Sequence, residues 1–422
     1  MYFFSQSLFK IFPFMKYYII LQPSIRSMGG EEMYTRNKVV SAREHGFVPI
    51  VIHSGIGEKI YIEDLKIYDK YEFSEFRYEP CVVSSKKKSI VLNRLRDILK
   101  DFSNDSIIES HEILVAEWGE WLAKKLGIRH FIYMLLEHNS LYNKSLYDFF
   151  YFKYKRQELA GIVEATIPEM FKKYSKVVGY ALPAYCTNTY EDIPCLDAFK
   201  VGKADFTIGT IGRTNKQYVQ PMIDSILKFA SIYKDKRFNV LYVGGSMDKQ
   251  SEYNVISRFS SARNVNLYFT GMVFPISIEL IRQMDVCIAS SGSCIVSYNC
   301  GIPTIVVDGN DSKAIGIYGK TTDRLLFRGE NDRVIEIEEL LDKIFVQKIY
   351  KKEDDIKYVD IDFSTHWSFL KQMANKREYY DISNIKLPLK RKLLSIFLGY
   401  YYGLNPNSIK HRIITKTLRC LS

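Results

Sequence analysis

Two successive runs of alternating strand and helix patterns constrain the fold of this chain more than any other feature. The first run opens with a strand pattern over 16–21, followed by a helix over 31–45. The second run opens with a strand pattern over 206–211, followed by a helix over 219–233. Short apolar runs that alternate with helices indicate parallel βαβ units. We therefore predict an α/β chain with two doubly wound domains.

The restart of the pattern near residue 205 predicts where the domains divide. We expect one domain over 15–200, a second over 201–350, and a C-terminal helical segment over 351–422. The part of the chain between the two runs, 140–204, is expected to be mostly helical. Open α/β sheets bind ligands outside the carboxyl ends of their strands. Two such sheets therefore predict a binding site in a cleft between the domains.

Charge is distributed unevenly along this chain. The formal net charge is +11, and residues 1–30 and 382–422 contain basic residues but no acid, so the two ends account for the whole excess. An enzyme acting on nucleic acid usually spreads positive charge over its working face. We therefore expect no nucleic-acid partner and instead an anionic membrane surface. The seven cysteines form no CxxC pair, which argues against a disulfide framework and favours a reducing compartment.

The C-terminal end combines a basic cluster with an apolar stretch. The cluster over 390–392 precedes the apolar run 393–402, which is too short to span a bilayer. This pattern is typical of a helix that lies in the membrane interface. The other interpretation is a helix packed on the protein with a solvated basic face. The first predicts a cytoplasmic enzyme peripheral to the inner face of the cell membrane.

Three loops at expected carboxyl ends of strands carry groups that suit an anionic ligand. Gly29 and Gly30 precede a helix, so backbone N–H groups can approach a ligand near the positive end of the helix dipole. Arg213 and Lys216 offer a planar fork and a point charge for a diphosphate. The segment 290–293 combines hydroxyls with free helix N–H groups. The plainer interpretations are a tight turn, two solvated cations and a helix cap.

Five segments in chain order carry a resemblance to a known family: Met28-Gly-Gly30, Gly212-Arg213 with Lys216, Leu241-Tyr-Val-Gly-Gly245, Phe269-Thr-Gly-Met-Val273, and Asp285-Val-Cys-Ile-Ala-Ser290 running to Cys300-Gly-Ile-Pro303. With these segments, residues 15–345 resemble a GT-B-fold glycosyltransferase, most like glycosyltransferase family 4. The resemblance implies two Rossmann-like domains and a nucleotide-sugar donor bound mainly to the second.

The same resemblance implies a role for each matching residue. It implies that Arg213 and Lys216 hold the diphosphate, that Gly271, Met272 and Val273 lie beside the base, that Ser291, Gly292 and Ser293 meet the phosphates or the sugar, that Gly29 and Gly30 approach from the first domain, and that Gly212 and Gly244 complete the donor site. One departure stands out. The family usually has two glutamates eight positions apart near the last segment, whereas 290–301 contains no acid and Val296 stands near the second position.

Polar residues after two strands of the first domain are candidates for acid–base chemistry on the acceptor. They are Glu109, His111 and Glu112 after one strand, and Glu137 and His138 after the next. A histidine beside a carboxylate can orient or deprotonate a hydroxyl. We predict His111, His138, Glu109 and Glu137 as the catalytic residues. The plainer interpretation is a set of hydrogen-bonded loop residues.

These patterns favour a glycosyltransferase that moves a sugar from a nucleotide-sugar donor to a lipid-linked or cell-surface glycan precursor. We expect no cofactor and no metal, with the nucleotide-sugar as substrate; Asp360-Ile-Asp362, which resembles a metal-binding pair, is interpreted as a solvated face. The resemblance implies retention at the anomeric carbon. Two alternatives stay open: a non-catalytic glycan-binding or scaffold protein, and a nucleotide-dependent epimerase or oxidoreductase. The second needs a GxGxxG turn, which the first loop of this chain lacks.

Overall fold

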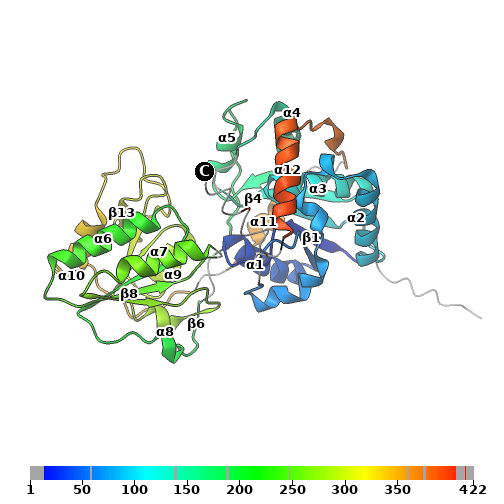
Figure 1. The fold of residues 1–422 in the computed structure, drawn as a ribbon. Helices are drawn as coiled ribbons and strands as arrows, with labels where there is room; N and C mark the ends of the chain where they lie inside the picture. Colours follow the sequence, from blue (N-terminus) through cyan, green and yellow to red (C-terminus); the bar gives the residue numbers. More distant parts are fainter. Residues whose placement is uncertain are drawn as a thin grey trace, which may run out of the picture.

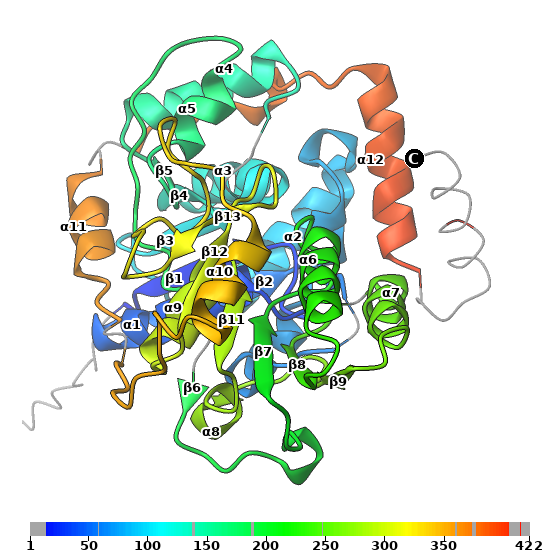
Figure 2. The ribbon, with the colours of Figure 1, turned by 90° about the vertical axis from the view of Figure 1, so that its left-hand side faces the viewer.

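The computed structural model contains two large, mainly parallel sheets, each with helices on both faces (Figures 1 and 2). It describes residues 14–57, 59–136, 140–186, 190–246, 248–358, 361–373 and 377–404, together with Ile414. Both runs of alternating strands and helices expected from the sequence are present. The predicted α/β class with two Rossmann-like units is therefore confirmed.

The first sheet has five parallel strands in the order β2-β1-β3-β4-β5. Alternate residues of β1 enter two different apolar cores, with Tyr18 and Ile20 on one face and Ile19 and Leu21 on the other. Burial on both faces explains why the strand reads as an unbroken apolar run. The elements of this unit are β1 (Tyr17–Gln22), α1 (Gly30–Glu44), β2 (Val48–His53), α2 (Ser85–Ile98), β3 (Ile107–His111), α3 (Glu112–Leu126), β4 (Arg129–Met134), α4 (Lys144–Lys155), β5 (Leu159–Gly161) and α5 (Thr166–Phe171).

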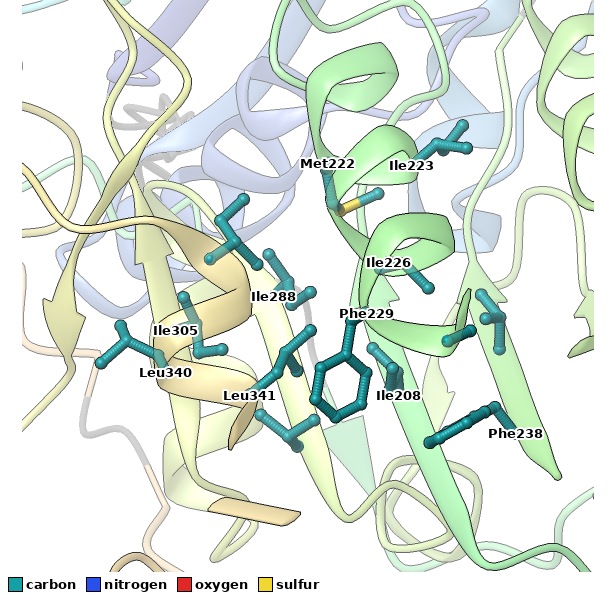
Figure 3. Packing of buried hydrophobic residues seen from close by; sticks show 14 of the residues in the cluster. Ile208, Met222, Ile223, Ile226, Phe229, Phe238, Ile288, Ile305, Leu340 and Leu341 are labelled. Carbon is teal, nitrogen blue, oxygen red and sulfur yellow. The ribbon is translucent and has the colours of Figure 1, made fainter. Parts of the chain in front are cut away.

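The second sheet has six strands in the order β13-β12-β11-β7-β8-β9, with only β13 antiparallel to its neighbour. Figure 3 shows one of its cores, where Phe229 and Leu341 from two helices pack over Ile208 and Ile305 of the strands. The elements are β7 (Phe206–Ile211), α6 (Val219–Ile232), β8 (Phe238–Val243), α7 (Lys249–Phe259), β9 (Val265–Phe269), α8 (Ile278–Ile281), β11 (Val286–Ala289), α9 (Gly292–Asn299), β12 (Thr304–Val307), β13 (Ala314–Ile317) and α10 (Ile337–Phe345).

The segment between the two sheets is less helical than expected. Besides α4 and α5 it contains β5 and a short strand β6 (Tyr190–Glu191), which pairs with β10 (Ile276–Ser277) of the second unit. Extended backbone also continues the edge of the first sheet, because the Leu182 N–H donates to the Gly161 carbonyl at 2.9 Å. The chain here satisfies its backbone groups by pairing with sheet edges, which a helical pattern does not reveal.

The C-terminal segment returns to the first unit, as Figure 1 shows for its last helices, coloured orange to red. The indole of Trp367 in α11 (Ser364–Gln372) stacks on the ring of Phe47 and donates to Ser41 Oγ at 2.9 Å. Helix α12 (Leu389–Tyr402) follows on the same unit, where Ser395 Oγ accepts from the Glu79 N–H at 3.3 Å. None of the helices in the described part of the chain has the length and apolar character needed to cross a membrane.

Candidate functional site

The site begins at the loop between β1 and α1. A Cβ atom on Gly30 would lie 3.3 Å from Cys186 Cβ, so a glycine here allows the segment around Cys186 to pass close to the start of the helix. The first turn of α1 carries Glu31 and Glu32, which suits the positive end of the helix dipole. Glu32 is buried and accepts a hydrogen bond from Ser27 Oγ. The predicted glycines therefore lie beside two carboxylates.

A buried network connects this loop to the end of β3. Glu109 and His111 point to the same face of the strand because they are two residues apart. Glu109 accepts from the hydroxyls of Tyr18 and Tyr34, the second at 2.6 Å, and from His111 Nε2 at 2.9 Å. His111 Nδ1 lies 3.3 Å from Glu31 Oε1. The structure thus joins two of the predicted catalytic residues to a carboxylate of α1.

Charge in this network is strongly coupled. Burial would raise the pKa of Glu109, but the hydrogen bond from His111 and the charge of Lys38 lower it to about 2. Burial would lower the pKa of His111, but its hydrogen bonds to Glu109 and Glu31 raise it to about 9. His111 is therefore an imidazolium at neutral pH, with both ring nitrogens engaged and no exposed surface. This geometry favours a positioning role for His111.

Lys38 supplies the second positive charge near Glu109. Its Nζ lies 4.5 Å from the ring centre of Trp367, 4.9 Å from Phe363 and 5.1 Å from Tyr18, and has no hydrogen-bond partner among the described residues. Burial lowers the pKa of Lys38 to about 8. Two of the three rings come from the C-terminal segment, so that segment completes the network from more than three hundred residues away.

Glu112 extends the acidic side of this edge. It begins α3 with a φ of 64°, a left-handed conformation that is unusual for a side chain of this size. Burial and the charges of Glu31 and Glu32 raise its pKa to about 7, despite the opposing charge of His111. Burial and Glu31 likewise raise the pKa of Glu32 to about 7. Both carboxyls therefore exchange protons near neutral pH, as a general acid or base must.

The Glu112→Gln variant should weaken the pH dependence of stability. The pKa of Glu112 is about 7 in the folded protein against an ordinary value of 4.5, so its contribution to stability is lost as the pH rises through that interval. Between about pH 5 and about pH 8, the variant should therefore gain ~1–3 kcal/mol relative to wild type. Thermal unfolding at the two pH values measures this. If the stability of the variant and of wild type changes equally between the two pH values, the raised pKa of Glu112 is contradicted. Glu44→Gln, which removes an exposed carboxyl, is the matched control.

On the second unit, two glycines bring strand ends together. Gly212 follows β7 with a φ of 156°, and Gly244 follows β8 with a φ of 133°. A Cβ atom on Gly244 would lie 2.2 Å from the Gly212 carbonyl oxygen, so only glycine fits. Gly244 also forms an antiparallel bridge with Gly271. The structure thus gathers three of the predicted donor-site glycines at the carboxyl edge of this sheet.

Arg213 and Lys216 lie in the exposed turn between Gly212 and α6. The charge of Arg213 acts on Glu32 of the first unit, where it opposes the rise in that carboxyl's pKa. The positive charge of Arg213 therefore lies within electrostatic reach of Glu32 on the other unit. Met272 and Val273 follow Gly271 in the neighbouring loop, and Phe274 after them packs against the first unit's core.

The third predicted loop begins α9, and its cap differs from the expectation. Ser291, with a φ of 59°, is the N-cap residue, so Ser293 lies inside the first turn and not at the cap. The Ser291 N–H donates to the Leu325 carbonyl at 2.6 Å. The buried Ser290 Oγ has no hydrogen-bond partner among the described residues. An unpartnered hydroxyl at a helix N-terminus is a ready donor to an anion.

Glu137 and His138 lie outside the described residues, as does Asp360. Asp362 accepts hydrogen bonds from the backbone and side chain of Ser364 at the start of α11, so its carboxylate has a structural role there. Val296, near the second missing glutamate, is fully buried in an apolar core.

A small cavity lined by Tyr298 and its neighbours lies at the opposite end of α9 from Ser291.

Sequence reasoning missed Glu31, Glu32 and Lys38. The first two were visible as consecutive acids after Gly30, but an acidic first turn is also what an ordinary helix needs. Lys38 had no sequence signal, because the aromatic rings around it come from β1 and from the C-terminal segment, which are far apart in the sequence.

Comparison with known proteins identifies the fold. No protein-family model and no curated protein matches the chain. A solved glycosyltransferase from Rickettsia africae ESF-5 matches with a TM-score of 0.52 at 16% identity, over 90% of this chain and 98% of that one. Anabaena HepE in complex with UDP and glucose gives 0.48 at 11% identity, over 80% and 91%. The UDP-GlcNAc 2-epimerase from Neisseria meningitidis, bound to UDP-GlcNAc, gives 0.41 at 13% identity, over 81% and 95%.

The chain therefore has the predicted GT-B type of fold, with two Rossmann-like units. The specific resemblance to glycosyltransferase family 4 stays a prediction.

Proposed function

We propose that this protein is a glycosyltransferase whose donor, a nucleotide-sugar, binds at the carboxyl edge of the second sheet. The observation that carries the proposal is that groups able to bind an anion lie at this edge. They are Arg213 and Lys216 in one turn, and the unpartnered Ser290 hydroxyl at the start of α9. Gly212, Gly244 and Gly271 let a ligand approach the backbone between these groups. The GT-B fold is one that solved glycosyltransferases share.

The chemistry of glycosyl transfer matches these groups. Negative charge develops on the leaving diphosphate as the bond to the anomeric carbon breaks, and preorganised cations and helix N–H groups stabilise it. Arg213, Lys216 and the N-terminus of α9 supply that stabilisation from the protein itself, so we propose a metal-independent reaction. Retention at the anomeric carbon rests on the family resemblance alone.

The first unit then presents the acceptor. In this proposal the imidazolium of His111, held by Glu109, positions Glu31 toward the acceptor side. Glu137 and His138 keep their predicted acid–base role. The acceptor is a lipid-linked or cell-surface glycan precursor, and the enzyme works at the cytoplasmic face of the cell membrane. The acid-free, basic C-terminal end supports this location.

A panel of nucleoside diphosphates and nucleotide-sugars in a thermal-shift assay tests the proposal. A ligand that binds only the folded protein raises stability by RT ln(1 + [L]/Kd), so the true donor and its diphosphate should give a shift of several degrees. Adenine, guanine, uracil and thymine nucleotides are compared at equal concentration. If none raises the unfolding temperature, a donor site of this kind is absent.

One observation favours a second candidate, epimerisation of a nucleotide-sugar. Glu32 and Glu112 both have a pKa of about 7, and the charge of Arg213 acts on Glu32; two such carboxyls suit removal and return of a proton on a bound sugar. Proton NMR of the donor during incubation separates the two activities. Transfer releases the nucleoside diphosphate only with an acceptor present, whereas epimerisation converts the sugar without one.

A further inference from the structure

Helix α12 packs against the protein through its small and polar side and exposes its apolar side. Ser395 and Gly399 are buried, and Gly399 lies close against the ring of Tyr78. Leu389 and Leu393 are instead 73% and 60% exposed, and they share a stripe with other exposed side chains along the helix: Ile396, Phe397 and Tyr400. An ordinary surface helix has the opposite arrangement. The exposed stripe therefore calls for a partner.

Basic residues flank this stripe. On a helix of 3.6 residues per turn, Lys390 and Lys392 fall on opposite sides of the line through Leu389, Leu393 and Ile396. Both are exposed, and the chain contains no acid from residue 382 onward. Long lysine side chains can reach a polar boundary while their stems cover apolar surface. The stripe thus combines an apolar centre with cationic edges, which complements a surface with an apolar interior and anionic head groups.

The helix is held firmly in this orientation. Arg391 Nε lies 3.2 Å from Glu79 Oε1, and its guanidinium stacks 4.7 Å from the ring centre of Tyr142. Ser395 Oγ accepts from the Glu79 N–H. These contacts come from the side of α12 opposite the apolar stripe. The stripe therefore faces outward as a fixed part of the first unit, and Figure 2 shows α12 at the outer side of that unit.

We propose that the outward stripe of α12 docks the first unit on a bilayer that contains anionic phospholipid. The helix lies in the plane of the interface, with Leu393, Phe397 and their neighbours among the acyl chains and Lys390 and Lys392 at the head groups. This inference deepens the proposed function, on which the location of the enzyme rests, by naming the element that meets the membrane. It also fixes which face of the acceptor-side unit lies toward the lipid.

Vesicle flotation of the full chain tests the inference. Wild type should float with phosphatidylcholine vesicles that contain phosphatidylglycerol and remain unbound with phosphatidylcholine alone. The Leu393→Asp/Phe397→Asp double variant should lose binding. Lys390→Glu/Lys392→Glu should weaken it at least tenfold, since each cation near an anionic leaflet contributes about fivefold. Ile232→Asp, on α6 at a site that is 62% exposed, is the control and should bind as wild type.

Two results would overturn the inference. Unchanged flotation of the aspartate variant would place membrane contact elsewhere. A wild-type dimer that the aspartate variant converts to a monomer, with no vesicle binding by either, would make the stripe a contact between two copies; light scattering with size exclusion measures this. The nucleotide thermal shift is read on the same samples. Flotation without a nucleotide-induced thermal shift would reject the donor site and keep the docking surface. A thermal shift without flotation would keep the donor site and reject the docking surface.

Discussion

Replacing Arg213 and Lys216 together by alanine should abolish sugar transfer and weaken nucleoside-diphosphate binding by ~100-fold or more. A hydrogen bond to a charged group contributes about 1.5–3 kcal/mol, so each cation accounts for at least about tenfold in affinity. Both side chains are exposed in a turn after β7, so the fold should survive their removal. Donor turnover and calorimetric titration with the diphosphate measure the two effects.

The Lys234→Ala/Arg263→Ala double variant is the matched control for charge. Both residues are exposed, and they precede β8 and β9 at the amino ends of the strands, opposite the proposed site. The control removes the same number of charges from the same unit. It should keep wild-type turnover and affinity. If the two double variants lose equal activity, the effect is one of net charge, and the assigned roles of Arg213 and Lys216 are wrong.

Glu109→Ala should destabilise the first unit by about 3–5 kcal/mol. The carboxylate is fully buried beside the His111 imidazolium and the Lys38 ammonium, and its loss removes the counterion of Lys38 and leaves His111 with Glu31 alone. Two tyrosine hydroxyls also lose their acceptor. Urea unfolding followed by tryptophan fluorescence measures the change, because Trp118 and Trp367 are buried in this unit.

Comparison variants separate charge from packing at this position. Glu109→Gln keeps the shape and part of the hydrogen bonding and should still destabilise, because the negative charge is what the two cations need. Glu44→Ala removes an exposed carboxylate from the end of α1 and should change stability by less than about 0.5 kcal/mol. If Glu109→Ala is as stable as Glu44→Ala, the buried charge network does not hold this unit together.

The two sheets could be predicted because their signals are local. The strand over 206–211 and the glycine after it lie together in the sequence, and both appear in β7 and Gly212 as expected. The antiparallel edge strand β13 and the short pairing of β6 with β10 were missed, because each depends on where an existing sheet edge lies. Local pattern determines an element, and edge pairing depends on tertiary contact.

The site could be predicted only in part for the same reason. Arg213 and the glycines carried a signal in their loops, whereas the surroundings of His111 depend on Glu31, eighty residues earlier in the chain. The cage around Lys38 needs Trp367, which only the return of the C-terminal segment brings near. The pattern of α12 indicated an amphipathic helix, but its small residues decide which side packs, and that reverses the usual orientation.

Hydrogen exchange with and without a saturating nucleoside diphosphate tests the central claim most directly. We predict slower exchange in three segments at the carboxyl edge of the second sheet: 212–218, 270–274 and 290–295. Protection there would follow from ligand contact with backbone N–H groups and from the closed turn around Arg213. Protection confined to the first unit, or none in these three segments at saturation, would contradict the proposed donor site.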